Sequence, residues 1–274
     1  MSQYLSAPPE PRAGLIMSWI FPFRIQMGQK FMYDSVRMVV RVSPWALIKG
    51  PCEEQELEAL LYVTSHTTIP CPKIYRTYRR SNGLFIEMEY IPGTNLETAW
   101  DAGLTETTKQ EIGNNIRGFV EQLRALEPPK DVAVGSPYGR QLKDGRVSFN
   151  PIPSFETISS FHAFLEGGLS RAQVLELKRT HGEQVQVYRT FFSHADICAR
   201  NFILKDDGSL VWIDWEFAGW WPEYWEYTKS HFAVFKELPG WLEMIEESLP
   251  VYTAELERER SLWQLPRPPN GPLP

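Results

Sequence analysis

Cysteine is scarce in this chain, and the few cysteines do not form pairs. The 274 residues include three, Cys52, Cys71 and Cys198, and no two of them have the C-x-x-C spacing. An odd number of scattered thiols does not provide a disulfide framework and favours a reducing compartment. We therefore expect each cysteine to be a small, buried apolar residue.

The sequence also lacks a surplus of basic charge and a long apolar segment. The formal net charge is −6, which argues against a protein that acts on nucleic acid or on an anionic membrane. The apolar stretch Met17–Arg24 is too short to span a membrane and is broken by Pro22, and no secretory signal is evident. We expect a cytoplasmic protein with no nucleic-acid partner and no membrane partner; the sequence leaves the oligomeric state open.

The first third of the chain has the pattern of a small α/β lobe. Residues 1–29 are rich in proline and have little periodicity, which predicts a loose N-terminal arm that docks through Trp19 and Phe21. Residues 30–91 then contain apolar and β-branched runs around one segment with apolar residues at the i, i+3, i+4 spacing. The expected strands cover residues 37–42, 46–49, 74–78 and 84–88, and the expected helix covers residues 53–65.

After Pro92 and Gly93 the pattern becomes mainly helical, up to about residue 265. Apolar periodicity predicts helices, a stretch rich in Pro and Gly predicts an ordered surface loop, and Asp207-Gly208 predicts the turn of a hairpin. The fold class is therefore α+β, with a small β-rich N-lobe and a larger, mainly helical C-lobe. The expected elements are helices at 105–126, 157–169, 181–190 and within 224–263, the surface loop at 127–153, hairpin strands at 202–204 and 210–213, and a frayed tail at 266–274.

One run of polar residues in the C-lobe has the spacing that phosphoryl transfer requires. Asp196 and Asn201 are separated by four residues, as in the D-x-x-x-x-N pattern of kinase catalytic loops, and Asp214 ends an apolar strand. Phosphoryl transfer needs one carboxylate to orient the attacking hydroxyl, and an Asn and a second carboxylate to hold Mg²⁺ against the phosphates. These three residues supply that set; turn capping and hairpin polarity are the alternative explanation.

Two motifs carry a resemblance to a known family. The run FSHADICARN (Phe192–Asn201) and the run IDWEFAGWWPEYWE (Ile213–Glu226) resemble the aminoglycoside phosphotransferase/choline kinase superfamily, and they are especially similar to its fungal-type branch. The resemblance covers roughly residues 37–265 and implies a two-lobed protein-kinase-like fold. It implies Asp196 as catalytic base, Asn201 and Asp214 as Mg²⁺ ligands, and His194 as a brace of the loop. Arg200 is expected either to reach a phosphate or to form a structural salt bridge.

The first lobe contains candidates for the nucleotide site. Lys49 ends an apolar strand, where kinases place the lysine that binds the α- and β-phosphates, and a helix carboxylate must orient it. Glu56 borders the apolar face of the expected helix, and the resemblance also selects it; Glu53 is the alternative. A surface lysine on a strand remains the alternative explanation of Lys49.

The hinge and the phosphate loop of this site are less well defined by sequence. Glu89, Tyr90 and Ile91 resemble the hinge whose backbone recognises adenine. No glycine lies between Gly28 and Gly50, so the G-x-G-x-x-G loop is absent. A shorter loop at residues 32–36 is expected to place Ser35 near the phosphates.

The acceptor is expected to be small. Asp214 continues directly into WEFAGWWP (Trp215–Pro222), which leaves no segment ending in A-P-E to dock a polypeptide. Glu216, Trp220 and Glu223 are candidates for the acceptor pocket, where carboxylates and aromatic faces suit an amine; alternatively the aromatics are core residues and the carboxylates cap helices. The expected reaction is phosphorylation of a small-molecule hydroxyl by ATP with Mg²⁺. A catalytically silent kinase-like domain that binds a nucleotide, a metabolite or a protein is the alternative.

Overall fold

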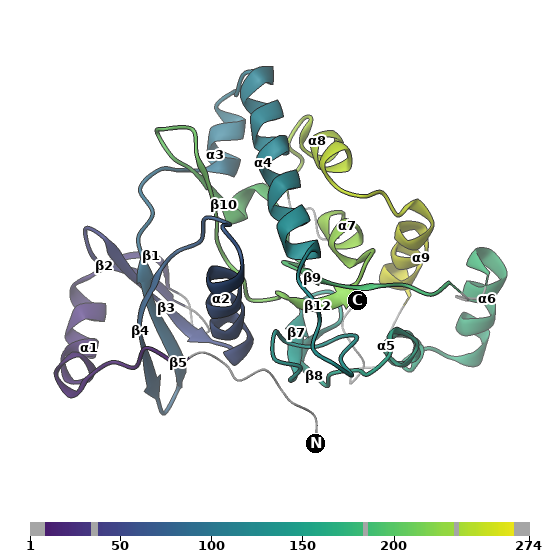
Figure 1. Ribbon diagram of the computed structural model, residues 1–274, viewed down its shortest axis with the longest axis horizontal. Helices are drawn as coiled ribbons and strands as arrows, with labels where there is room; N and C mark the ends of the chain where they lie inside the picture. The colour runs from purple at the N-terminus through teal and green to yellow at the C-terminus, as the bar shows by residue number, and fades with distance from the viewer. Residues whose placement is uncertain (1–8, 34–37, 183–185, 233–235, 266–274) are drawn as a thin grey trace.

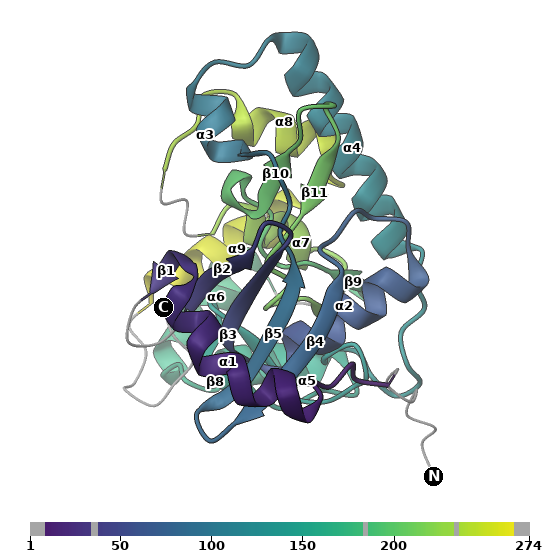
Figure 2. The ribbon, with the colours of Figure 1, turned by 90° about the vertical axis from the view of Figure 1, so that its left-hand side faces the viewer.

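The N-terminal part is an antiparallel sheet with a helix on each face, seen in the computed structural model (Figures 1 and 2). The structure describes residues 9–33, 38–182, 186–232 and 236–265. The sheet has the order β1-β2-β3-β5-β4. Helix α2 (Glu54–His66) packs on one face through Leu57, Leu60 and Val63. The strands are β1 (Gln29–Tyr33), β2 (Met38–Ser43), β3 (Ala46–Cys52), β4 (Ile74–Arg80) and β5 (Gly83–Glu89).

The prediction of a loose N-terminal arm was wrong over residues 15–27. These residues form helix α1 (Leu15–Met27), whose Phe21 is 8% exposed and contacts the rings of Tyr78 and Phe85, whereas Trp19 is 83% exposed. Pro22 lies inside this helix and has no N–H to donate to the carbonyl of Ser18. The guanidinium of Arg80 donates to that carbonyl instead, so a side chain from the sheet compensates for the proline.

The C-terminal part is mainly helical, and short strands lie among its helices (Figure 1). Its long helix α4 buries an apolar stripe that includes Ile112, Ile116 and Leu123. Among the described residues no helix is long and apolar enough to cross a membrane. The helices are α3 (Leu96–Asp101), α4 (Glu106–Arg124), α5 (Ile158–Glu166), α6 (Arg171–His181), α7 (Trp225–Ser230), α8 (Trp241–Ser248) and α9 (Thr253–Gln264), and the strands are β6 (Thr94–Asn95), β7 (Leu142–Asp144), β8 (Ser148–Ile152), β9 (Thr190–Ser193), β10 (Phe202–Leu204), β11 (Leu210–Trp212) and β12 (Gly219–Pro222).

Two expectations for this part were wrong. The expected surface loop at 127–153 contains the β7–β8 hairpin, and Leu142, Asp144 and Val147 within it are buried. The helix expected at 181–190 instead covers Arg171–His181, while residues 186–189 are not helical. Ser170 and Gln173 form a capping box that starts this helix, and this S-x-x-Q pattern is the sequence signal that identifies the true helix.

Candidate active site

Lys49 lies between two carboxylates that come from different parts of the chain. Its Nζ atom is 2.6 Å from Oε1 of Glu56 on α2 and 2.6 Å from Oδ1 of Asp214. Burial alone would lower the pKa of this ammonium group, but the charges of Asp214 and Glu56 outweigh that effect and raise the pKa well above its usual value. Glu53, the alternative partner, is half exposed and pairs with Lys143 at 3.2 Å. The structure therefore brings Lys49, Glu56 and Asp214 together, as a phosphate-binding lysine requires.

The second half of the site is the loop from His194 to Asn201. The side-chain amide of Asn201 donates to Oδ2 of Asp196 at 2.7 Å and to its carbonyl oxygen at 3.0 Å. Because the amide nitrogen faces Asp196, the carboxamide oxygen is the atom of Asn201 that remains for a cation. Arg200 pairs with the Asp196 carboxylate at 3.1 Å. Of the two roles expected for Arg200, the structure contains the salt bridge.

His194 braces this loop from a fully buried position. Its ring lies 4.5 Å from the Trp212 ring in a stacked arrangement, and its Nε2 atom is 3.1 Å from the carbonyl oxygen of Ile213. A carbonyl only accepts, so Nε2 carries the proton and donates it. Burial lowers the pKa of His194 to about 4, so the ring is neutral near pH 7. It connects the catalytic loop to the residue before Asp214.

Glu226 is a site residue that sequence reasoning did not select. It is 5% exposed, and its two carboxylate oxygens accept hydrogen bonds from the backbone N–H groups of His194 at 2.6 Å and Ala195 at 2.9 Å. Ala195 has a positive φ of 61°, which is strained for a residue with a side chain. Glu226 thus stabilises the strained turn that directs Asp196 toward the site. Its only sequence signal was its place as the last residue of the run IDWEFAGWWPEYWE.

Asp214 also has a strained backbone, with φ of 62°. The backbone N–H of Ile213 donates to the carbonyl oxygen of Asn201 at 2.9 Å, which joins the two motifs directly. A carboxylate from Asp214 and a carboxamide oxygen from Asn201 are hard oxygen donors of the type that Mg²⁺ prefers. The donor set of the site therefore fits the expected metal, with substrate phosphates and water to complete its shell.

The hinge has one backbone donor that is not used by the sheet. The N–H groups of Glu89 and Tyr90 donate to the carbonyl oxygens of Lys73 and Trp45. Within the described part of the chain no hydrogen bond is formed by the N–H of Ile91, which follows the last strand of the sheet. Of the three expected hinge residues, Ile91 therefore has the N–H that remains for a ligand, because those of Glu89 and Tyr90 are used within the protein. Ser35 lies outside the described residues.

Two of the three residues expected in the acceptor pocket lie elsewhere. Trp220 is fully buried in β12 and its indole donates to the carbonyl oxygen of Pro137 at 3.0 Å, so it is a core residue. The carboxylate of Glu223 accepts from the backbone N–H of Arg189 and from the hydroxyl of Tyr252. Glu223 follows the end of β12 that pairs with Thr190, away from the end that pairs with Ser193 beside the catalytic loop. Both predictions were wrong. Trp220 packs in the core, and Glu223 binds the backbone of Arg189 and the hydroxyl of Tyr252.

Glu216, the third candidate, lies on the nucleotide side. It lines a cavity of about 260 Å³ together with Lys49, Glu56 and Lys143. The charge of Glu216 contributes to the raised pKa of Lys49. This position corrects the expectation that Glu216 borders the acceptor.

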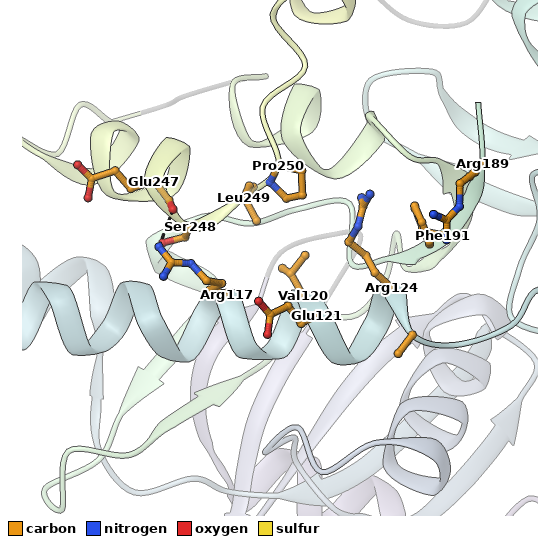
Figure 3. A pocket seen from close by; sticks show the side chains of 11 residues that line it. Arg117, Val120, Glu121, Arg124, Arg189, Phe191, Glu247, Ser248, Leu249 and Pro250 are labelled. Atoms are coloured by element: carbon orange, nitrogen blue, oxygen red, sulfur yellow. Dashed lines mark hydrogen bonds between the residues drawn. The ribbon is translucent and has the colours of Figure 1, made fainter. Parts of the chain in front are cut away.

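The cavity beside Asp196 has a different lining. It measures about 310 Å³ and lies between the catalytic loop, α3, α7 and the start of α8. A larger cavity of about 580 Å³ lies on α4 and contains none of the predicted site residues (Figure 3). Volume alone therefore does not identify the site; proximity to Asp196 does. The lining of the smaller cavity consists of Glu97, Asp196, Ile197, Cys198, Ala199, Arg200, Lys229, Ser230, Phe232, Lys236, Leu238 and Trp241.

The chain belongs to the phosphotransferase enzyme family, because the sequence model of that family matches residues 33–259. No curated protein matches the chain. Among solved structures it is similar to the GDP and kanamycin complex of APH(2")-IIia, with 17% identity, a TM-score of 0.58, and coverage of 90% of this chain and 86% of that one. It is also similar to ADP-bound aminoglycoside phosphotransferase APH(2'')-Ib, with 15% identity, a TM-score of 0.59, and coverage of 89% and 84%.

A third similar structure is spectinomycin phosphotransferase APH(9)-Ia in complex with ADP and spectinomycin, with 16% identity, a TM-score of 0.52, and coverage of 85% and 78%. At these identities the likeness establishes the fold. The expected fold class, a β-rich N-terminal region followed by a helical C-terminal region, is confirmed.

Proposed function

We propose that this protein transfers the γ-phosphoryl group of ATP to a hydroxyl group of a small molecule. The observation that carries the proposal is the position of Lys49, whose Nζ atom contacts Glu56 and Asp214 at 2.6 Å each, opposite the Asp196–Asn201 pair. Catalysis of phosphoryl transfer depends on positioning and on charge neutralisation, and this arrangement supplies both. The solved relatives whose names include GDP, ADP or ATP support a nucleotide as the donor.

Each residue of the site then has a defined task. Asp196 accepts the hydrogen of the acceptor hydroxyl and orients its oxygen toward the phosphate. Lys49 leaves its contact with Asp214 when phosphate oxygens replace that carboxylate, while Glu56 continues to orient it. Asn201 and Asp214 would hold Mg²⁺, which when bound neutralises the charge that develops on the phosphates. Arg200, paired with Asp196, is placed to hold that carboxylate in its orientation.

The proposal also assigns the two regions of the chain. Residues 30–91 contribute the nucleotide side, with the backbone N–H of Ile91 directed to the base, and residues 92–265 contribute the loop and the acceptor cavity. The runs FSHADICARN and IDWEFAGWWPEYWE support the assignment to the fungal-type branch of the family. A cytoplasmic location agrees with the composition.

Nucleotide binding can be tested by thermal denaturation with and without Mg·ATP. A ligand present at 100 times its Kd stabilises the folded state by about 2.7 kcal/mol, which raises the melting temperature by several degrees. We expect this shift in the wild type and its loss in Lys49→Met. Mg·GTP, tested in parallel, shows whether the protein prefers adenine or guanine nucleotides. Absence of any nucleotide-dependent shift would contradict the proposal.

Turnover can be tested in a metabolite extract with mass-spectrometric detection of phosphorylated products. Asp196→Asn should abolish a product that the wild type forms, while Asp206→Asn, a change at an exposed position of the hairpin turn, should leave it unaffected. Nucleotide binding without any product would favour the catalytically silent domain. A product that persists in Asp196→Asn would exclude Asp196 as the base.

A further inference from the structure

The cavity beside Asp196 is lined by more cations than carboxylates. Arg200, Lys229 and Lys236 contribute positive charge, whereas Asp196 and Glu97 contribute negative charge. Kanamycin and spectinomycin, which occur in the complexes of similar structures, are amines. A cavity that binds several ammonium groups requires carboxylates that are available to pair with them.

Both carboxylates that line this cavity already have cationic neighbours from the protein. Asp196 pairs with Arg200 at 3.1 Å, and Glu97 lies 3.9 Å from the Nζ atom of Lys236. Asp101, outside the lining, also pairs with Lys236. An ammonium group of an acceptor would therefore have to replace a protein cation at each carboxylate, and it would approach Lys236 closely.

The third cation of the cavity lining is a buried lysine. Lys229 on α7 is 5% exposed, and its Nζ atom lies 3.1 Å from Oδ1 of Asp144 and 5.0 Å from the centre of the Phe232 ring. Asp144 is fully buried and does not line the cavity, whereas Lys229 does. The cavity therefore meets the positive member of this pair first. Asp144 offsets part of the charge of Lys229, but the carboxylate lies behind the ammonium group, so a ligand in the cavity is closer to the positive charge, which favours an anion over an ammonium group.

The structure of this cavity also limits the rest of the acceptor. Its remaining wall includes Phe232, Leu238 and Trp241, which suit a carbon skeleton. Resting on the proposed function, we propose that the acceptor is a hydroxyl compound that carries a carboxylate or another anionic group and is not a polyamine. Lys236 and Lys229 contact that anion, and Asp196 receives the hydroxyl.

Matched sets of compounds that differ only in charge provide the test. One set is glucuronate, glucose and 6-amino-6-deoxyglucose; the other is mandelate, 1-phenylethane-1,2-diol and 2-amino-1-phenylethanol. Calorimetric titration into the full-length protein saturated with Mg·ADP should give at least tenfold tighter binding of an anionic member than of its amine. Lys236→Glu should reverse this preference, whereas Lys130→Glu, a change at an exposed lysine outside the cavity, should preserve it.

Three results would overturn the inference: tighter binding of the amines, no binding by either anionic member, or an unchanged preference in Lys236→Glu. Because the readout is binding, it does not depend on turnover. Turnover of an amine would refute the inference and leave the proposed function intact. Selective anion binding by a protein that forms no phosphorylated product in the metabolite extract would contradict the proposed function and leave only the charge preference of the cavity.

Discussion

Glu226 provides a direct test of how the catalytic loop is held. Glu226→Ala removes the acceptor of two buried N–H groups, those of His194 and Ala195. A buried donor without a partner costs about 1–3 kcal/mol, so the pair corresponds to a loss of roughly 2–6 kcal/mol in the free energy of unfolding. The strained φ of Ala195 loses its support at the same time. We expect a large decrease in kcat, because Asp196 directly follows this turn.

The size of the destabilisation should depend on pH. Burial raises the pKa of Glu226 to about 7, although the two N–H groups oppose that effect. A carboxyl whose folded-state pKa exceeds its unfolded value contributes stability that is present below about pH 4.5 and is lost as pH rises through about 7. At about 1.36 kcal/mol per pKa unit, the wild type loses up to roughly 3 kcal/mol from this group over that range. Glu226→Ala should therefore be less destabilising at pH 8 than at pH 5.

Urea unfolding at pH 5 and pH 8, combined with steady-state kinetics, measures both effects. Glu226→Gln retains one acceptor oxygen and should show about half of the loss in stability. Glu243→Ala, at an exposed position on α8, serves as the control and should change neither quantity. An unchanged kcat in Glu226→Ala, or a destabilisation that grows as pH rises, would refute this account of the loop.

Three further predictions follow from the structure. Trp220→Phe should lower the melting temperature because a buried indole loses its hydrogen bond to a carbonyl oxygen. The KM for the acceptor should stay unchanged, and a raised KM would indicate that Trp220 contributes to the acceptor pocket after all. Phe21→Ala should lower the free energy of unfolding in urea by about 3–5 kcal/mol, whereas Trp19→Ala, at a position 83% exposed, should change it by less than about 0.5 kcal/mol; equal effects would contradict the packing of α1. The pKa of His194 is lowered to about 4, so the unfolded state binds more protons between about pH 4 and 6.5 and stability falls as pH drops through that range. Urea unfolding between about pH 4 and 6.5 should show a weaker pH dependence of stability in His194→Gln than in the wild type. An identical pH dependence would show that the ring of His194 is not held neutral.

Local signals in the sequence were sufficient for several elements. The alternation of apolar residues in the strands and the leucine spacing of α2 depend on neighbours along the chain, and these elements appear within a few residues of their expected positions. The D-x-x-x-x-N spacing placed Asp196 and Asn201 on one short loop, where their side chains now form a hydrogen bond. Such contacts form between residues near in sequence, so a linear pattern is enough to predict them.

Contacts between distant residues could not be read in this way. No pattern in the sequence indicates that Arg80 would donate to the carbonyl oxygen left without a partner by Pro22, so helix α1 was not predicted. Trp220 and Glu223 were predicted for a binding pocket from their residue types. Their actual environment depends on the pairing of β12 with β9. Burial is a property of the assembled core, and residue type alone does not determine it.

The sequence by itself determined the chemical class of the site, because phosphoryl transfer requires few residue types at fixed short spacings. The tertiary structure decided which charges meet. Lys49 reaches Asp214 across 165 positions of the chain, and the cavity beside Asp196 combines residues of several elements, with three cations and two carboxylates in its lining. Electrostatic interaction depends on distance in space rather than along the chain. The motifs were therefore sufficient to predict the class of reaction, whereas the charge preference proposed for the acceptor depends on the fold.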